Sequence, residues 1–197
     1  MTHIGHSEKV FIMRIFLSVL ILIFCLQSLT KADDVEDFEI EAIRVGDSLL
    51  EHFTEDEINN FEGQIYSIPE KNKYKRIYIL DNIKNYEYLA IDFKLNDDQY
   101  IIHGLAGMID YSNKKECSDK QNEIAKDLKS IISQEPKKTT ITSKYDKTGK
   151  SKIYYYYYKL NNGYLQIICS IYAEHTNIQG GLDLSVRSKE FQMWLDS

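Results

Sequence analysis

The sequence predicts an α+β domain in which an antiparallel sheet of hairpins packs against one long helix, preceded by short N-terminal helical turns. Two observations support this prediction. Segments rich in β-branched and aromatic residues alternate with turn residues, and apolar residues recur at helical spacing between Glu116 and Ser133. After Ala32 the chain has no Gly/Ser-rich linker and no internal repeat, so residues 33–197 are expected to form a single domain.

The segment 1–32 is typical of a secretory signal peptide. Arg14 precedes a run of twelve residues, IFLSVLILIFCL, that is apolar except for Ser18. A membrane span needs about 20 apolar residues, so this run is short for a permanent anchor. Thr30 and Ala32 suit a cleavage site after Ala32, and Met13 is a candidate for the true start. An uncleaved N-terminal anchor is the alternative.

A cleaved signal peptide predicts a periplasmic or secreted protein that keeps no permanent membrane span. Two cysteines remain after cleavage, Cys117 and Cys169. An even number of cysteines in an exported protein predicts a disulfide, with two buried free thiols as the alternative.

The charge balance is acidic and restricts the class of partner. The chain has 24 Lys and Arg residues against 30 Asp and Glu residues, for a net charge of −6. This balance argues against binding to nucleic acid and to anionic lipid. We therefore expect the partner to be a protein or a small ligand.

The first elements after the signal are expected to be short. Residues 38–45 alternate in part between apolar and polar, which predicts a strand that ends at Gly46. Asp47 or Ser48 can then cap a helical turn that reaches Phe53.

A capping box and a meander follow. Thr54 and Glu57 form the capping box of a helix over residues 55–61. β-branched and aromatic residues dominate the next part of the chain, which predicts an antiparallel meander. Its strands are expected at residues 76–80, 87–95 and 99–110.

The long helix is predicted over residues 116–133, where apolar residues share one face and Pro136 follows as a helix stop. Cys117 lies on that apolar face. The next segment, residues 137–152, is basic and rich in threonine, and we expect it to be a solvated loop.

The C-terminal part predicts a hairpin, a strand and a helical turn. Residues 153–160 and 164–173 flank Asn161-Asn162-Gly163, which is a strong hairpin signal. A strand is expected at residues 182–186, and Ser188 can cap a last helical turn. Cys169 lies in the second hairpin strand, so a bridge to Cys117 would pin the long helix onto the sheet.

Five consecutive tyrosines, Tyr154–Tyr158, stand in the first hairpin strand. Alternation along a strand places Tyr155 and Tyr157 on one face and the other three on the opposite face. One face would pack in the core, and the other would display phenols that suit a sugar or a protein partner. Tyr155 and Tyr157 are therefore a candidate binding surface. The alternative is an ordinary half-buried strand, because tyrosine favours strands.

The segment Gly46-Asp47-Ser48-Leu49 reads GDSL and resembles the nucleophile block of the GDSL (SGNH) esterases and lipases. In that family the serine is activated by a histidine that follows an aspartate by three residues, and a Gly-x-Asn-Asp block supplies oxyanion donors. This chain contains neither pattern. We therefore interpret the four-residue match as coincidental, with Ser48 as a helix cap. The candidates for catalysis that remain are Ser48, His52 and His175.

No metal or cofactor site is predicted. The histidines after the signal are His52, His103 and His175, and none belongs to a His-x-x-x-His pattern or pairs with a cysteine at metal-ligand spacing. Without a complete catalytic constellation, enzyme activity is the less favoured interpretation.

Several segments resemble a group of exported proteins from SAR11-type marine alphaproteobacteria. These proteins share an IGDSLL-like element, a YIIHG-like strand that ends at a tyrosine, one cysteine before the long helix, and a final S-K-E-F-x-x-W-L. The matching residues in this chain are Val45–Leu50, Tyr100–Gly104, Tyr111, Cys117 and Ser188–Leu195. The resemblance implies export and carries no activity with it. More distantly, two short helical elements before a meander are similar to the SmpA/OmlA-type domain of outer-membrane assembly lipoproteins.

Together these features predict an exported, soluble envelope protein that acts as a non-enzymatic binding or accessory module and contacts a protein or a small ligand through its sheet. The alternative is a small GDSL-type esterase that uses Ser48.

Overall fold

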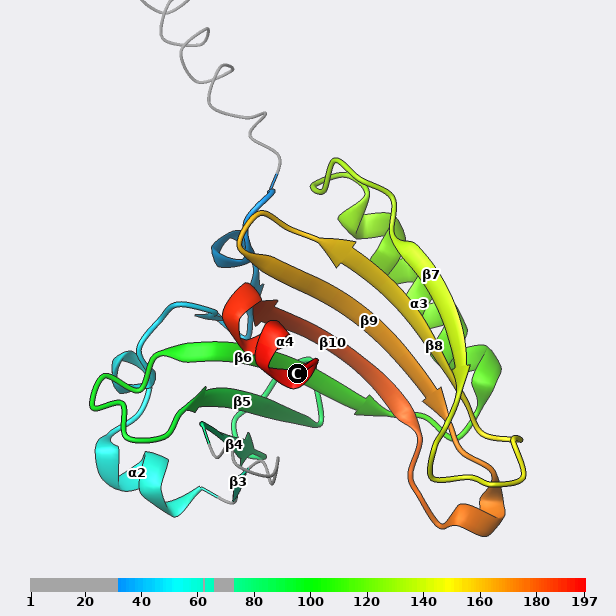
Figure 1. Ribbon diagram of the computed structural model, residues 1–197, viewed down its shortest axis with the longest axis horizontal. Helices are drawn as coiled ribbons and strands as arrows, with labels where there is room; N and C mark the ends of the chain where they lie inside the picture. The colour runs from blue at the N-terminus through cyan, green and yellow to red at the C-terminus, as the bar shows by residue number, and fades with distance from the viewer. Residues whose placement is uncertain (1–31, 62, 66–72) are drawn as a thin grey trace, which may run out of the picture. The chain divides into compact units, whose positions relative to one another are not determined.

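The computed structural model describes residues 32–61, 63–65 and 73–197 (Figure 1). The predicted signal peptide, including its start site at Met13, lies outside these residues except for Ala32. Nothing in the fold therefore tests the predicted cleavage.

Within the described residues, eight strands form one antiparallel sheet with the order β3-β4-β5-β6-β10-β9-β8-β7. The strands are β3 (Gly63–Ile65), β4 (Tyr74–Ile79), β5 (Tyr88–Lys94), β6 (Ile102–Asp110), β7 (Lys137–Thr142), β8 (Lys152–Lys159), β9 (Gly163–Ile171) and β10 (Gly181–Ser188). Two four-stranded meanders, β3–β6 and β7–β10, meet where β6 pairs with β10. The predicted α+β class with an antiparallel sheet of hairpins is confirmed.

Short elements precede the sheet, one long helix connects its two halves, and a short helix follows its last strand. The N-terminal segment contains η1 (Val35–Asp37), a small hairpin of β1 (Glu39–Ile40) and β2 (Ile43–Arg44), η2 (Leu49–Glu51) and α2 (Glu55–Asn60). The long helix α3 (Lys114–Leu128) crosses from β6 to β7. A turn, η3 (Glu174–Thr176), precedes β10, and α4 (Lys189–Leu195) follows it.

One face of the sheet carries the main core. Successive cross-strand partners on this face are fully buried in a row, namely Ile77, Ile91, Leu105, Val186 and Leu165. The helix α3 and the apolar residues of the N-terminal segment pack on this face in a single hydrophobic cluster. Burial of this apolar surface is the main favourable contribution to folding.

A disulfide joins Cys117 of α3 to Cys169 of β9, and their Cα atoms are 5.9 Å apart. Both residues are fully buried. The predicted pairing is confirmed, and it holds the long helix against the second meander. On the chain-entropy model, a cross-link over this span stabilises a fold by about 4 kcal/mol.

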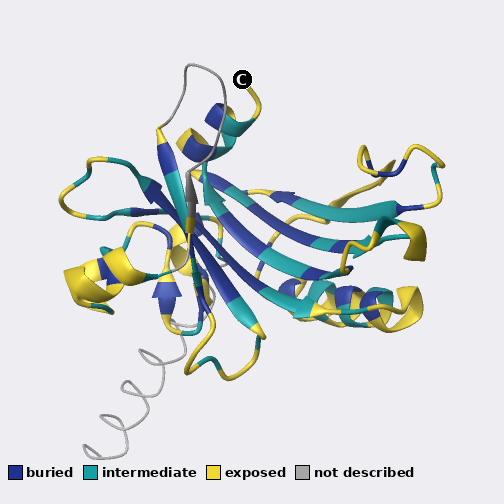
Figure 2. Ribbon diagram, turned by 90° about the horizontal axis from the view of Figure 1, so that it is seen from below, coloured by how far each residue is buried: buried dark blue, intermediate teal, exposed yellow. Residues whose placement is uncertain are grey.

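The opposite face of the sheet carries α4 at one end, next to the marked C-terminus in Figure 2. Ser188 caps α4 by accepting a hydrogen bond from the backbone N–H of Phe191 at 3.2 Å. Phe191 and Trp194 pack with Tyr74 of β4 in a small second core. A Cβ atom at Gly104 would lie 2.8 Å from the Phe191 ring, so glycine is needed there for α4 to approach the sheet.

The prediction of a loop over residues 137–152 is wrong for residues 137–142. Lys137–Thr142 form β7, which pairs with β8, and the loop begins only at Ser143. Every side chain of β7 is exposed, so no apolar alternation marks it as a strand. Its lysines also suit the last strand of a sheet, because charge there opposes pairing with another chain.

Three smaller differences concern element ends. The strand predicted at residues 38–45 is split into β1 and β2, because Glu41 and Ala42 turn the chain with φ angles of 53° and 65°. The long helix ends at Leu128 instead of residue 133, although Ile132 is still buried beyond it. The strand β3 is not predicted by the sequence patterns.

Candidate functional site

Ser48 is the N-cap of η2. Its Oγ accepts a hydrogen bond from the backbone N–H of Leu50 at 3.2 Å and donates one to the backbone carbonyl of Gln99 at 2.6 Å. The Ser48 backbone also forms a bridge with Ile101, just before β6. Gly46 has a φ of 101°, which favours glycine in this turn. Local backbone geometry therefore accounts for the glycine and the serine of the GDSL segment.

His52 faces Asp47 and not Ser48. The His52 Nε2 atom lies 3.6 Å from Asp47 Oδ2, and the same carboxylate oxygen accepts a hydrogen bond from the backbone N–H of Arg44 at 2.9 Å. Within the part of the chain that the structure describes, no hydrogen bond joins Ser48 to a histidine. The geometry gives Ser48 no general base.

His175 lies in η3 and contacts the loop between β7 and β8. Its Nε2 atom is 3.1 Å from Asp146 Oδ1. The Asp146 carboxylate also accepts hydrogen bonds from Thr148 and Ser151, which hold its pKa well below the ordinary value, the Thr148 side chain contributing most. Because the carboxylate and not the imidazole is the centre of this network, we assign His175 a structural role in joining two loops.

The closest serine–histidine contact that the structure shows involves other residues. His103 Nδ1 lies 3.2 Å from Ser188 Oγ and 4.0 Å from Glu190 Oε2. Burial lowers the pKa of His103, and the nearby Lys94 lowers it further. Serine and carboxylate approach the same ring nitrogen, so no relay through the imidazole is formed. Ser188 remains the cap of α4.

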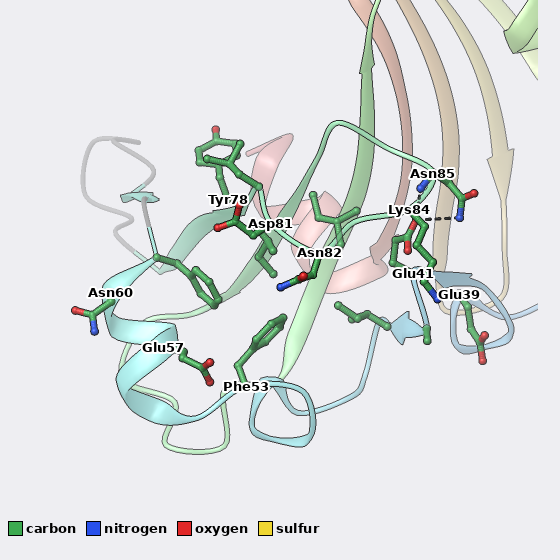
Figure 3. A pocket seen from close by; sticks show the side chains of 16 residues that line it. Glu39, Glu41, Phe53, Glu57, Asn60, Tyr78, Asp81, Asn82, Lys84 and Asn85 are labelled. Atoms are coloured by element: carbon green, nitrogen blue, oxygen red, sulfur yellow. Dashed lines mark hydrogen bonds between the residues drawn. The ribbon is translucent and has the colours of Figure 1, made fainter.

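A cavity of about 850 Å³ lies between the β1–β2 hairpin, α2 and the chain after β4 (Figure 3). Four carboxylates line it, and three of them, Glu39, Glu41 and Glu57, have partners within the protein. Glu41 accepts hydrogen bonds from the backbone and side-chain nitrogens of Asn85 at 2.8 and 2.9 Å. Glu57 belongs to the capping box of α2, and Glu39 pairs with Arg44. These three acids therefore have hydrogen-bond or ion-pair partners without a ligand.

The face of the sheet opposite α3, which we call the open face, carries tyrosines from several strands. Alternate residues of β4 to β10 point to it, and α4 packs on one end of it. Half-buried tyrosines from several strands gather on this face, which are Tyr78, Tyr88, Tyr155, Tyr157 and Tyr164. Tyr155 and Tyr157 thus point away from α3, as the alternation predicts.

One row across the open face has a carboxylate at its centre. Strand register aligns one residue from each of five strands in the order Tyr88, Met108, Asp183, Ile168 and Tyr155. Neighbouring strands are 4.7–4.9 Å apart, so the backbone of Asp183 lies roughly 10 Å from that of each tyrosine. The two tyrosines flank Asp183 symmetrically, with one apolar residue between on each side.

A cavity of about 300 Å³ opens over this row, at the end of the open face away from α4. Three tyrosines line it, Tyr88, Tyr155 and Tyr172, together with the carboxylates of Asp110 and Asp183. Tyr157 lies two residues closer to α4, outside this lining, with its ring 5.2 Å from that of Tyr164. Of the two tyrosines predicted as a binding surface, the structure therefore places Tyr155 in the cavity.

The lining of this cavity contains two acids, Asp110 and Asp183, and no basic residue. The Oδ1 atom of Asp183 is buried and has no hydrogen-bond partner among the described residues. Burial raises the pKa of Asp183 and also that of Asp110, where Glu87 adds to the effect. Burial and these two carboxylates raise the pKa of the Tyr88 phenol.

The chain matches no protein-family model, no curated protein and no solved structure.

Two further observations concern metal binding and membrane spans. Over residues 32–61, 63–65 and 73–197, no group of three His, Cys, Asp or Glu side chains is placed to hold a metal ion. Over the same residues, no helix is long and apolar enough to cross a membrane.

Sequence reasoning missed Asp183, Tyr88 and Tyr172 as site residues. They come from segments far apart in the chain, and only the pairing of β10 with both β6 and β9 brings them together. The sequence indicates only that Asp183 and Ser185 share one face of the predicted strand at residues 182–186, where they alternate with apolar residues.

Proposed function

We propose that the protein is an exported, non-enzymatic binding module that holds its ligand on the open face of the sheet. The observation that carries this proposal is the cavity over Asp183, where tyrosine rings surround a carboxylate whose buried Oδ1 atom has no hydrogen-bond partner among the described residues. Concave sites with aromatic walls and a few polar groups are the usual form of small-ligand sites.

Export is supported by the signal-like segment 1–32 and by the buried Cys117–Cys169 disulfide. Structural disulfides persist in oxidising compartments and are rare in the cytosol. A periplasmic or secreted location fits both features.

An esterase that uses Ser48 is not favoured by the geometry. Catalysis by a serine needs a base within hydrogen-bond reach and donors for the oxyanion. The Ser48 hydroxyl instead donates to the Gln99 carbonyl, and His52 contacts Asp47.

The proposal is tested by mapping where small molecules bind. The purified ¹⁵N-labelled protein is titrated with a library of fragments of mixed charge, and amide shifts are followed by NMR. We expect shifts to cluster on β8, β9 and β10 and to be lost in Tyr155→Ala. Tyr145→Ala, which removes an exposed tyrosine from the loop after β7, is the matched control and should leave them unchanged. Shifts that cluster around Ser48 or in the cavity of Figure 3, or no shifts at all, would contradict the proposal.

A further inference from the structure

We propose that the cavity over Asp183 binds an organic ammonium group, with Asp183 as its counter-ion and Tyr88, Tyr155 and Tyr172 as its aromatic walls. This inference rests on the proposed function and names the chemistry of its ligand.

The first support is the charge of the lining. Two carboxylates, Asp110 and Asp183, contribute to the cavity wall, and its lining contains no lysine, arginine or histidine. The two carboxylates of the lining would repel an anionic ligand. The buried Oδ1 atom of Asp183 has no hydrogen-bond partner among the described residues, and desolvation of a carboxylate is costly, so a cation that pairs with Asp183 gains more than it would at the protein surface.

The neighbouring arginines on the open face do not fill this role. Burial raises the pKa of Asp183 by more than Arg187, Arg76 and a hydrogen bond with the Ser185 side chain lower it. The Arg187 guanidinium donates to the side-chain oxygen of Gln192 at 3.3 Å, and Arg76 forms two hydrogen bonds with Asp92. The buried Oδ1 atom of Asp183 accepts no hydrogen bond from the described residues.

The second support is the aromatic walls. A cation near the face of a tyrosine ring is attracted by the ring quadrupole, most strongly where water is excluded. Tyr88 and Tyr155 stand on opposite sides of Asp183 in the same cross-strand row. Burial is the main reason why the pKa of both phenols is raised, and the carboxylate of Asp183 adds to it in each, while Arg187 opposes it at Tyr155.

The third support distinguishes an organic ammonium from a metal ion. Calcium and magnesium need six or more oxygen ligands, mostly from carboxylates, carbonyls or water. The cross-strand neighbours of Asp183 on both sides are instead apolar, namely Met108 and Ile168. Apolar side chains suit the methyl groups of a quaternary ammonium, which needs no hydrogen-bond acceptors of its own. The volume of about 300 Å³ lies at the lower end of small-ligand sites, as expected for such a ligand.

The test compares a cation with its neutral isostere. Choline chloride and 3,3-dimethyl-1-butanol have the same shape and differ in charge, and each is titrated into the purified protein by calorimetry and NMR at constant ionic strength. We expect choline to bind at least about tenfold more tightly, with shifts around Asp183, because desolvated cation–π and ionic contacts exceed this ratio. N-acetyl-lysine amide is titrated in parallel. Tighter binding of choline supports a free small ligand, and tighter binding of the lysine derivative supports the same site filled by a protein side chain.

Variants separate charge from shape. Asp183→Asn should bring the choline-to-alcohol affinity ratio close to one, and Tyr155→Leu should weaken choline binding severalfold. Tyr155→Phe keeps the ring and should retain binding, as should Tyr157→Leu, which lies outside the cavity. If Asp183→Asn fails to fold, the Tyr155 pair still tests the aromatic wall.

Equal affinity of the two isosteres, or no binding of choline and of the lysine derivative, would overturn the ammonium site. Fragments of another charge class that bind the open face would then leave the proposed function intact. Failure of every fragment to bind that face would overturn both.

Discussion

Arg76 of β4 and Asp92 of β5 are direct cross-strand partners, and the guanidinium donates to both carboxylate oxygens at 2.8 Å. Asp92 is 1% exposed, although it lies on the open face. Large neighbours and α4 exclude water from this end of the face, so the pair is a buried ion pair on a sheet surface that is half-buried elsewhere.

Removal of Arg76 from this ion pair should therefore strongly destabilise the fold. We expect Arg76→Met to lower the free energy of unfolding by about 3–5 kcal/mol, because it removes the guanidinium that donates to both oxygens of the buried Asp92 carboxylate. Chemical denaturation measures this change. Arg44→Met, which breaks the exposed Arg44–Glu39 pair, is the matched control and should cost about 1 kcal/mol or less. Equal effects of the two substitutions would show that the Arg76–Asp92 pair behaves as a surface pair.

A second prediction concerns how Asp183 makes the stability of the fold depend on pH. Its pKa is raised in the folded protein, so its ionisation destabilises the fold as the pH rises above the ordinary value of 3.8. Asp183→Asn should increase the melting temperature at pH 7, and the difference should vanish below pH 3.8, where both side chains are neutral. Thermal unfolding at several pH values checks this. A variant that is less stable than wild type at pH 7 would show that the carboxylate has a stabilising partner.

Glu190 should show the opposite dependence. Hydrogen bonds from Lys73 and Lys94 lower the pKa of Glu190 to about 2. The stability that this carboxylate contributes is therefore present above its ordinary pKa of 4.5 and is lost as the pH falls from 4.5 toward 2. Glu190→Gln should remove that part of the acid dependence of unfolding. Because 46% of the side chain is exposed, solvent screens these contacts and the effect should be modest.

Ser48→Ala separates capping from catalysis. Loss of the cap should cost about 1 kcal/mol of stability, because the backbone N–H of Leu50 loses its acceptor. Hydrolysis of p-nitrophenyl acetate should not change relative to wild type. A loss of hydrolysis in Ser48→Ala, with Ser188→Ala still active, would restore the esterase interpretation.

Reduction of the disulfide is a further test of the fold. The Cys117→Ala/Cys169→Ala variant should lose about 2–5 kcal/mol of stability and become insensitive to reductant. Urea denaturation with and without dithiothreitol measures both effects. Wild-type stability that does not respond to reductant would show that the bond is not formed in the purified protein.

Local patterns in the sequence were sufficient to predict most of the helices and strands. The Thr54–Glu57 capping box, the Ser188 cap and the Asn161-Asn162-Gly163 turn each specify their own element through nearby backbone groups. The Cys117–Cys169 pairing could also be predicted, because two cysteines after a signal peptide allow one pairing.

The parts that could not be predicted depend on contacts between distant segments. The strand β7 is held by pairing with β8 and buries no side chain, so its sequence has no apolar period. The site around Asp183 requires the order of strands across the junction of the two meanders, which no local pattern contains. Tyr155 could be assigned to a face by alternation, but its neighbours on that face could not.

The position of the disulfide also affects how the chain reaches its native topology. The pairing of β6 with β10 joins Ile109 to Leu182, which are distant in sequence, and closing so long a loop is entropically slow. Cys117 follows β6 closely, and Cys169 lies shortly before β10. Oxidation therefore shortens the path between these two strands, so the oxidised chain should join its two meanders faster than the reduced chain. The bond then acts on the folding rate as well as on the stability of the finished protein.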